Sequence, residues 1–461
     1  MKRIILIIAV VIIFTNQIFA ISVISGTWNR PLKDGSVSLY EVENGKLKPL
    51  ASSTLNAKKE FAFALNISKP GFYVVGISPQ SPMHNYTFYL KPNDNLNIEV
   101  NASSYTLIGE NTPENKELTR WHDLIEPLES KSIYFMGQNS TYVDFFPLFE
   151  EKLGEIEAFK SNITDTEFNK VFKDYRRFDL LKIALYFVQT PRSAHPKGED
   201  FPDYYGNVKL NDLSSTDAIL SYPYGTTLLR MARFLTASRL AENVTDEERK
   251  KIYDTYASLD RDLPNLINAE VKGEVVLQQS KSIQTYEGLI EFQNKYAKYL
   301  STEEQKKEFK ELLMSKASNS EGQDAFNFKF KDVNNKEISL SDFKGKLVYV
   351  DVWATWCGPC KKEIPSLKKI EAEYANKDIV FLGVSIDEQK SYDKWKEFLV
   401  TENLPGVQVF AGDQKEDITK PYKIAGIPRF MLFGKDGKII TIDAPRPSSN
   451  EIRSLLDAKL K

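Results

Sequence analysis

The sequence predicts a chain of several domains: an α/β domain at the C-terminus, preceded by a small β-sandwich-like domain and an α-helical domain. The length of 461 residues exceeds that of one ordinary domain. The residue pattern also changes along the chain, from short strand-like runs to helical periodicity and then to alternating strands and helices. We place the three domains at residues 21–107, 108–318 and 319–461.

The first twenty residues have the plan of a secretory signal peptide. Lys2 and Arg3 give a positive start, residues 4–14 are an unbroken apolar run of eleven, and Ala20 is a small residue at the end. The apolar run is short for a transmembrane helix. We therefore predict a signal peptide at 1–20 and a periplasmic protein, with an uncleaved membrane anchor as the alternative.

Residues 21–107 carry short runs of β-branched and aromatic residues that predict strands. Turn sequences such as Lys69-Pro70-Gly71 separate the runs. Short strands at this spacing are typical of a small antiparallel sandwich. The predicted strands are 37–40, 61–65, 72–77, 86–90 and 96–100.

Residues 108–318 change to helical periodicity, with apolar residues at intervals of three and four. The predicted helices are 142–159, 164–188, 224–241 and 286–300. Helix starts of the capping-box type stand at Thr164 to Glu167, Thr245 to Glu248 and Ser301 to Glu304. We expect a loop at 200–207 and a small polar linker at 317–323.

The last part of the chain alternates between strand-like and helix-like segments. This alternation predicts a sheet that is covered by helices. The predicted strands are 347–353, 379–385, 430–433 and 438–442, the last two forming a hairpin. The predicted helices are 361–374, 390–402 and 450–460.

The two cysteines of the chain stand together as Cys357-Gly358-Pro359-Cys360. With two residues between them, the sulfurs can close a small disulfide ring, or one thiolate can attack a substrate while the other resolves the mixed disulfide. No further cysteine exists for a structural disulfide, and so short a loop constrains the unfolded chain very little. A redox role is therefore favoured over a role in stability.

The cysteine pair falls where a predicted strand gives way to a predicted helix. We expect Cys357 at or just before the helix N-terminus, where free backbone N–H groups and the helix dipole lower the pKa of a thiol. Cys360, one turn into the helix, should be the more buried resolving thiol. Pro359 stiffens the loop without removing a helical hydrogen bond.

Three separate motifs resemble the thioredoxin family. They are the run from Val352 to Cys360 (VWATWCGPC), the following KKEIP from Lys361 to Pro365 and the loop Gly426-Ile427-Pro428. The second is similar to the exported TlpA/ResA-type thiol-disulfide oxidoreductases, and the third resembles the cis-proline loop that faces the disulfide. The resemblance covers about residues 322–461. It implies a thioredoxin fold for the C-terminal domain and dithiol–disulfide exchange as its chemistry.

The resemblance also implies roles for single residues. Asp351 matches the buried acid beneath the resolving cysteine, which could take the proton from Cys360. Glu363 matches an acid that tunes the thiols near the site, and either acid remains a candidate for the base. The residues expected to bind the substrate are Trp356, Gly358, Pro359, Ile427 and Pro428, with the backbone of Ile427 paired to an extended substrate segment.

Two neighbours of these motifs have other expected roles. Trp353 should belong to the core. Arg429 stands where thioredoxins commonly have a small polar residue, and it is expected to be a solvated surface side chain, with a preference for acidic partners as the alternative.

The resemblance favours a reductase that acts on protein thiols and disulfides and receives electrons from a membrane donor. A peroxidase of the same fold is an alternative, although Ala354 occupies the place where a peroxiredoxin carries threonine. We expect no cofactor and no metal, because two cysteines alone do not close a zinc site and the histidines lie elsewhere, at His84, His122 and His195.

The remaining expectations concern partners. The net charge of −2 gives no reason to expect nucleic acid. Residues 21–318 could instead form a binding module that recruits a protein substrate or pairs two copies of the chain.

Overall fold

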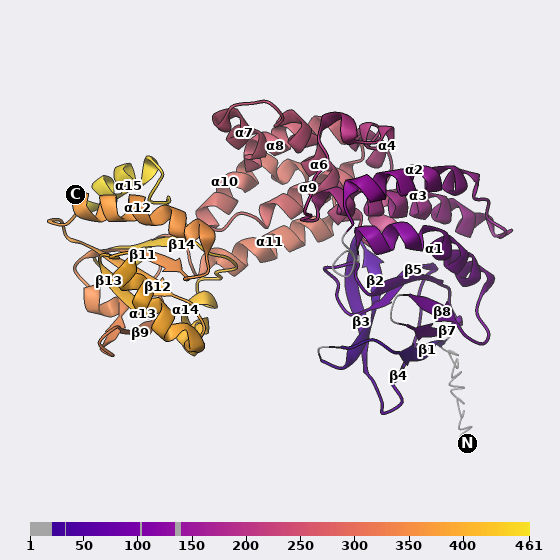
Figure 1. Ribbon diagram of the computed structural model, residues 1–461, viewed down its shortest axis with the longest axis horizontal. Coiled ribbons are helices and arrows are strands. Elements are labelled where there is room, and N and C mark those ends of the chain that lie inside the picture. The colour runs from indigo at the N-terminus through magenta and orange to yellow at the C-terminus, as the bar shows by residue number, and fades with distance from the viewer. Residues whose placement is uncertain (1–20, 33, 102–103, 134–139) are drawn as a thin grey trace, which may run out of the picture. The chain divides into compact units, whose positions relative to one another are not determined.

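The computed structural model describes residues 21–461 except 33, 102–103 and 134–139 (Figure 1). Contacts between residues divide the chain into two compact units, 1–275 and 276–461. The predicted signal peptide at 1–20 lies outside the described residues. Within the described part of the chain, no helix combines the length and apolar character that crossing a membrane requires.

The first unit begins with two four-stranded sheets, ordered β4-β1-β7-β8 and β3-β2-β5-β6. All five predicted strands are present, and β1, β3 and β8 were not predicted. Strand β1 pairs antiparallel with β4 and parallel with β7. The bounds are β1 Ser22–Trp28, β2 Ser36–Glu43, β3 Lys46–Thr54, β4 Glu60–Leu65, β5 Gly71–Gly76, β6 Asn85–Leu90, β7 Asn95–Val100 and β8 Tyr105–Leu107.

Alternate side chains of both sheets meet in one apolar core. Phe61 and Phe63 of β4 are buried, whereas the residues between and beside them are exposed, as the period of two in a strand requires. The other sheet contributes residues such as Val37 and Leu39 to the same core. The two sheets are therefore held together face to face by apolar packing.

Helices follow the sheets in the first unit. Their bounds are α1 Pro113–Ser132, α2 Tyr142–Ala158, α3 Thr166–Gln189, α4 Asp203–Gly206, α5 Leu210–Leu213, α6 Gly225–Leu240, α7 Asp246–Tyr253, α8 Thr255–Asp262 and α9 Ala269–Ser280, the last of which crosses into the second unit. Thr245 and Glu248 form the predicted capping box of α7. Helix α3 begins at Thr166, two residues later than predicted, because Asp165 is its N-cap and accepts the backbone N–H groups of Glu167 and Phe168.

The prediction of a loop at 200–207 is wrong, because α4 lies within it. Tyr205 is fully buried, and its hydroxyl donates to the carbonyl oxygen of Ala184 at 3.0 Å. Burial of this large side chain draws a segment rich in turn residues into a helical turn, a tertiary effect that local sequence does not report.

The second unit contains a seven-stranded sheet in the order β10-β9-β13-β12-β11-β14-β15. Its strands are β9 Lys329–Asp332, β10 Glu337–Ser339, β11 Leu347–Trp353, β12 Ile379–Ser385, β13 Val407–Phe410, β14 Arg429–Phe433 and β15 Ile439–Thr441. Its helices are α10 Tyr286–Tyr296, α11 Glu303–Ala317, α12 Gly358–Glu373, α13 Tyr392–Thr401, α14 Glu416–Thr419 and α15 Glu451–Leu460. Strand β11 lies parallel to β12 and antiparallel to β14.

Every residue of β11 is buried, because helices cover both faces of the sheet. Helices α12 and α15 share one apolar cluster with Leu347 and Tyr349, and Figure 1 shows both along the same face. The alternate residues Val348, Val350 and Val352 face the other cluster, to which α14 contributes. Strand β11 thus carries the cysteine motif at its end on a rigid central support.

The segment 317–323, expected to be a linker, is tied to the C-terminal sheet. Ile439 of β15 exchanges backbone hydrogen bonds with Gly322 and Gln323, each at 2.8 Å. The Asn319 side chain donates to the carbonyl oxygen of Pro421 at 2.8 Å. These contacts hold a small polar segment in place although its composition is that of a linker.

Candidate active site

The two cysteines lie at the junction between β11 and α12. Cys357 is the N-cap residue of α12, as predicted, and its sulfur accepts the backbone N–H of Cys360 at 3.2 Å. Pro359 stands in the first turn, where its missing N–H group costs no helical bond. The helix start therefore presents a positive end of the backbone dipole to Cys357.

Cys357 and Cys360 are joined by a disulfide bond, with their Cα atoms 5.3 Å apart. Each is 4% exposed, so the prediction that Cys360 is the more buried of the two is wrong. One apolar cluster surrounds both sulfur-bearing residues, which explains the equal burial. Its other members are Trp353, Ala354, Trp395, Leu399 and Phe410.

The residues around the disulfide differ sharply in exposure. Trp356 is 63% exposed, and Gly358 and Pro359 are exposed as well, so this segment forms a surface beside the buried sulfurs. Trp353, in contrast, is 3% exposed and belongs to the core, as expected.

The loop at Ile427 and Pro428 lies beside the same cluster. The peptide bond between these residues is cis, as the sequence motif predicted. Ile427 packs against the apolar cluster that contains both cysteines. The expectation of a solvated Arg429 is wrong: its side chain is 12% exposed, and its Nη1 lies 2.5 Å from Oδ1 of Asp443. This ion pair draws the guanidinium onto the hairpin of β14 and β15.

Asp351 is a buried acid in the middle of the sheet. It is paired with Gly383 of β12 and Phe430 of β14, and it is 9% exposed. Its Oδ1 atom is buried and has no hydrogen-bond partner in the described chain. Burial, and secondarily the negative charge of Glu363, raises the pKa of Asp351 to about 8. This acid can therefore gain or lose a proton near neutral pH.

Glu363 is the second buried acid, in the first part of α12, and is 6% exposed. The backbone N–H of Ser448 donates to its Oε2 and the Ser448 hydroxyl to its Oε1, both at 3.0 Å. Nη1 of Arg446 lies 3.8 Å from Oε1. The two acids thus differ in environment, since Glu363 accepts hydrogen bonds that Asp351 Oδ1 does not.

Sequence reasoning missed Ser448 and a third buried acid, Asp387, which holds Thr355 just before the cysteine motif. Asp387 follows the end of β12, and carboxyl ends of neighbouring parallel strands meet at one edge of a sheet. That position was the available signal for Asp387. No comparable signal marks Ser448, which reaches Glu363 across 85 positions of the sequence.

The three histidines lie in the first unit, apart from the cysteine motif in the sequence. His84 Nε2 lies 3.4 Å from Nη2 of Arg30, and burial, followed by the charge of Arg30, lowers the pKa of His84 to about 4. His122 Nε2 lies 2.7 Å from the hydroxyl of Ser104. Over the described ranges, no three His, Cys, Asp or Glu residues are grouped so that they could hold a metal ion.

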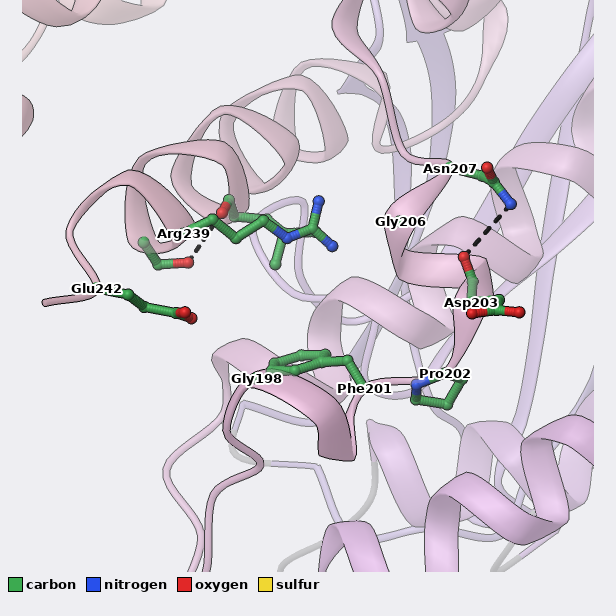
Figure 2. A pocket seen from close by; sticks show the side chains of 10 residues that line it. Gly198, Phe201, Pro202, Asp203, Gly206, Asn207, Arg239 and Glu242 are labelled. Carbon is green, nitrogen blue, oxygen red and sulfur yellow. Dashed lines mark hydrogen bonds between the residues drawn. The ribbon is translucent and has the colours of Figure 1, made fainter.

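A hollow of about 610 Å³ opens in the first unit. Figure 2 shows Arg239 and Glu242 at one side, Asp203 and Asn207 at the other, and the ring of Phe201 between them. None of the residues predicted for the redox site lines it. The residues predicted for the redox site all lie in the second unit, and the hollow is lined by residues of the first.

Known proteins resemble the C-terminal part of the chain. The Redoxin family model matches residues 320–458. The thiol-disulfide oxidoreductase ResA of Bacillus subtilis is 33% identical over 133 residues, which are 28% of this chain and 71% of ResA. The thioredoxin-like protein YneN of the same species is 31% identical over 137 residues, covering 30% of this chain and 79% of YneN.

A solved structure is similar over the same share of the chain. The thioredoxin domain of a thiol-disulfide oxidoreductase from Bacteroides vulgatus is 29% identical and covers 31% of this chain and 98% of that domain, with a TM-score of 0.28.

Proposed function

Because the chain belongs to the TlpA/ResA-type thiol-disulfide oxidoreductases, we propose that it exchanges its Cys357–Cys360 dithiol with disulfides of protein substrates outside the cytoplasm, as a reductase. Its C-terminal region has a thioredoxin-like fold, and the protein is an oxidoreductase. The observation that carries the proposal is the position of Cys357, whose sulfur accepts an N–H group at the start of α12.

In the first step, the thiolate of Cys357 attacks one sulfur of the substrate disulfide. A new bond forms between Cys357 and that sulfur, the substrate disulfide breaks, and its other sulfur leaves as a thiolate. The backbone N–H of Cys360 and the dipole of α12 stabilise the attacking thiolate. This environment keeps the nucleophile available at neutral pH.

In the second step, the sulfur of Cys360 attacks Cys357, and Asp351 accepts the proton of the Cys360 thiol. The bond between the cysteines forms, and the second substrate sulfur leaves as a thiolate. Two electrons have then passed from the cysteine pair to the substrate. A pKa of about 8 suits Asp351 to this transfer, because a base works best when its pKa lies near the operating pH.

Different roles for the two acids follow from their hydrogen bonds. Ser448 donates two hydrogen bonds to Glu363, which a carboxylate accepts and a protonated acid accepts less well. We therefore assign proton transfer to Asp351 and an electrostatic role to Glu363, whose charge contributes to the raised pKa of Asp351.

Substrate binding is assigned to the exposed surface beside the disulfide. Trp356, Gly358 and Pro359 present this surface to solvent, and the loop at Ile427 and Pro428 borders the cluster that holds the cysteines. An extended substrate segment would pair with the backbone of Ile427 and place its disulfide next to Cys357.

The proposal extends to the parts outside the redox region. We propose a signal peptide at 1–20, a β-rich domain at 21–107 and a helical domain at 108–318, whose limits fall between β8 and α1 and at the end of α11. A periplasmic protein of this kind would receive its electrons from a membrane donor. Pairing of two copies through residues 21–318 belongs to the same proposal.

Insulin reduction with a small thiol as electron donor tests the activity. We expect Cys357→Ser to abolish turnover and Cys360→Ser to accumulate mixed disulfides, because only the resolving thiol is missing. Activity that survives both changes would exclude the mechanism. The reduction potential, measured against glutathione, tests the direction of electron transfer. A value of about −270 mV supports a reductant, and one of about −120 mV supports an oxidant.

A further inference from the structure

Asp387 is a fully buried carboxylate, two residues beyond the end of β12. Beside it runs the segment that connects β11 to Cys357, and the backbone N–H of Ile386 donates to the carbonyl oxygen of Trp353 at 2.9 Å. A buried carboxylate is costly unless hydrogen bonds replace its water. The partners of Asp387 should therefore reveal what it does.

Both oxygens of Asp387 accept hydrogen bonds. Thr355 donates twice, from its backbone N–H to Oδ2 at 2.9 Å and from its hydroxyl to Oδ1 at 2.8 Å. The hydroxyl of Ser385 also donates to Oδ2, at 2.7 Å. Two of the three donors belong to Thr355, so the carboxylate clamps that residue by main chain and side chain together.

Thr355 lies inside the turn that leads to the reactive cysteine. The backbone N–H of Cys357 donates to the carbonyl oxygen of Ala354 at 3.0 Å, which closes a tight turn around Thr355. Ala354 and Thr355 are buried, whereas Trp356 is exposed. Asp387 thus holds the buried residue of a turn in which the next residue, Trp356, faces solvent.

We propose that Asp387 is a positioning residue: by clamping Thr355 it fixes the turn that holds the Cys357 sulfur at the N-terminus of α12, within reach of the Cys360 N–H group. The inference rests on the proposed function, in which Cys357 is the attacking thiol. Asp387 does not touch the substrate in this role. It acts on the thiolate through Thr355 alone.

An isosteric variant separates this role from an effect of charge. In Asp387→Asn the amide oxygen can accept from the Thr355 N–H and from Ser385, while the amide NH₂ donates to the Thr355 hydroxyl, which can turn to accept. The clamp therefore survives without its charge. In Asp387→Ala both the clamp and the charge are lost.

The test is the rate at which iodoacetamide alkylates Cys357 in the full-length protein, with Cys360→Ser in every variant so that one thiol reacts. We expect D387A to raise the apparent pKa of that thiol by about one unit, which slows alkylation near neutral pH about tenfold. D387N should react at least about half as fast as its parent. An unchanged D387A, or equal shifts in both variants, would overturn the positioning role.

A second pair decides the question if D387A does not fold, which circular dichroism would show. Thr355→Val removes the hydroxyl that donates to Oδ1, and Thr355→Ser keeps it. We expect T355V to alkylate about threefold more slowly than T355S, and equal rates would contradict the proposal. Alkylation involves no protein substrate, so its outcome is independent of the insulin assay that tests the function.

Discussion

Ser448 holds Glu363 by two hydrogen bonds, from its backbone N–H and from its hydroxyl, each 3.0 Å long. The loop after β15 thereby reaches across to the first part of α12. Asp351, the neighbouring acid on β11, has a buried oxygen with no such donor within the described ranges. The unequal supply of hydrogen-bond donors gives the two buried acids different environments.

Removal of the Glu363 charge should move the pH dependence of the resolving step. Burial and then Glu363 raise the pKa of Asp351, so Glu363→Gln should lower that pKa while leaving the effect of burial in place. We expect the midpoint of mixed-disulfide resolution against pH to fall by about one unit. Ser448→Ala keeps the charge and loses one donor, and serves as the matched control with a smaller shift. An unmoved midpoint in E363Q would show that Glu363 does not act on Asp351.

Asp351→Asn should separate stability from activity. The raised pKa means that the folded protein keeps a proton on Asp351 between about pH 4 and pH 8, where the unfolded chain has lost it. The unfolding free energy therefore falls as the pH rises through this window. Asparagine does not titrate, so the unfolding free energy of D351N does not fall in this way. At pH 8 it should exceed that of the parent by roughly 2–5 kcal/mol, and near pH 4 the two should differ little.

Urea unfolding of the second unit at both pH values measures the difference. The same variant should resolve mixed disulfides more than about tenfold more slowly, because the base is gone. Equal stability differences at the two pH values would contradict the raised pKa.

The sequence predicted the central strands well because each has seven residues and most of them are apolar. Strands β11 and β12 match the predicted 347–353 and 379–385 residue for residue. Strand β13 was missed because it has only four residues, and its first two are only partly buried. A strand of that kind owes its pairing to its neighbours more than to its own pattern.

In the site, too, residues within local sequence motifs could be predicted, whereas residues that act through contacts distant in the sequence could not. Cys357, Asp351 and the loop at Pro428 stand in motifs that can be read locally. Ser448 and Asp387 act through contacts across 85 and 32 positions of the sequence. The equal burial of the cysteines is also tertiary in origin, since side chains from α13 and β13 help to enclose both.

Trp356→Ala should impair protein substrates more than small disulfides. The side chain is 63% exposed, so its removal should change the unfolding free energy by less than about 0.5 kcal/mol. A protein substrate would lose apolar contact beside Cys357, and we expect KM for insulin to rise several-fold. The rate with a small aromatic disulfide should stay within about twofold. Val400→Ala, at an 80% exposed position of α13, is the control. Equal losses on both substrates would place Trp356 in the chemistry instead.

Lys182→Met should destabilise the first unit without touching the redox reaction. Lys182 of α3 is buried, and its Nζ lies 2.9 Å from Oε1 of Glu129 and 2.7 Å from Oδ1 of Asp179. Without the lysine, the two buried carboxylates lose their positively charged partner. Such a loss typically lowers the unfolding free energy by about 3–5 kcal/mol. Lys170→Met, at an exposed position of the same helix, is the matched control.

Thermal unfolding should show a lower transition temperature for K182M than for the parent. The transition temperature of K170M should be unchanged. At temperatures below that transition, both variants should reduce a small disulfide at the rate of the parent, because the cysteines belong to the second unit. A K182M protein as stable as the parent would show that the acids find other partners or protons when the lysine is removed. Lost redox activity in a K182M protein that is still folded would instead reveal coupling between the two units.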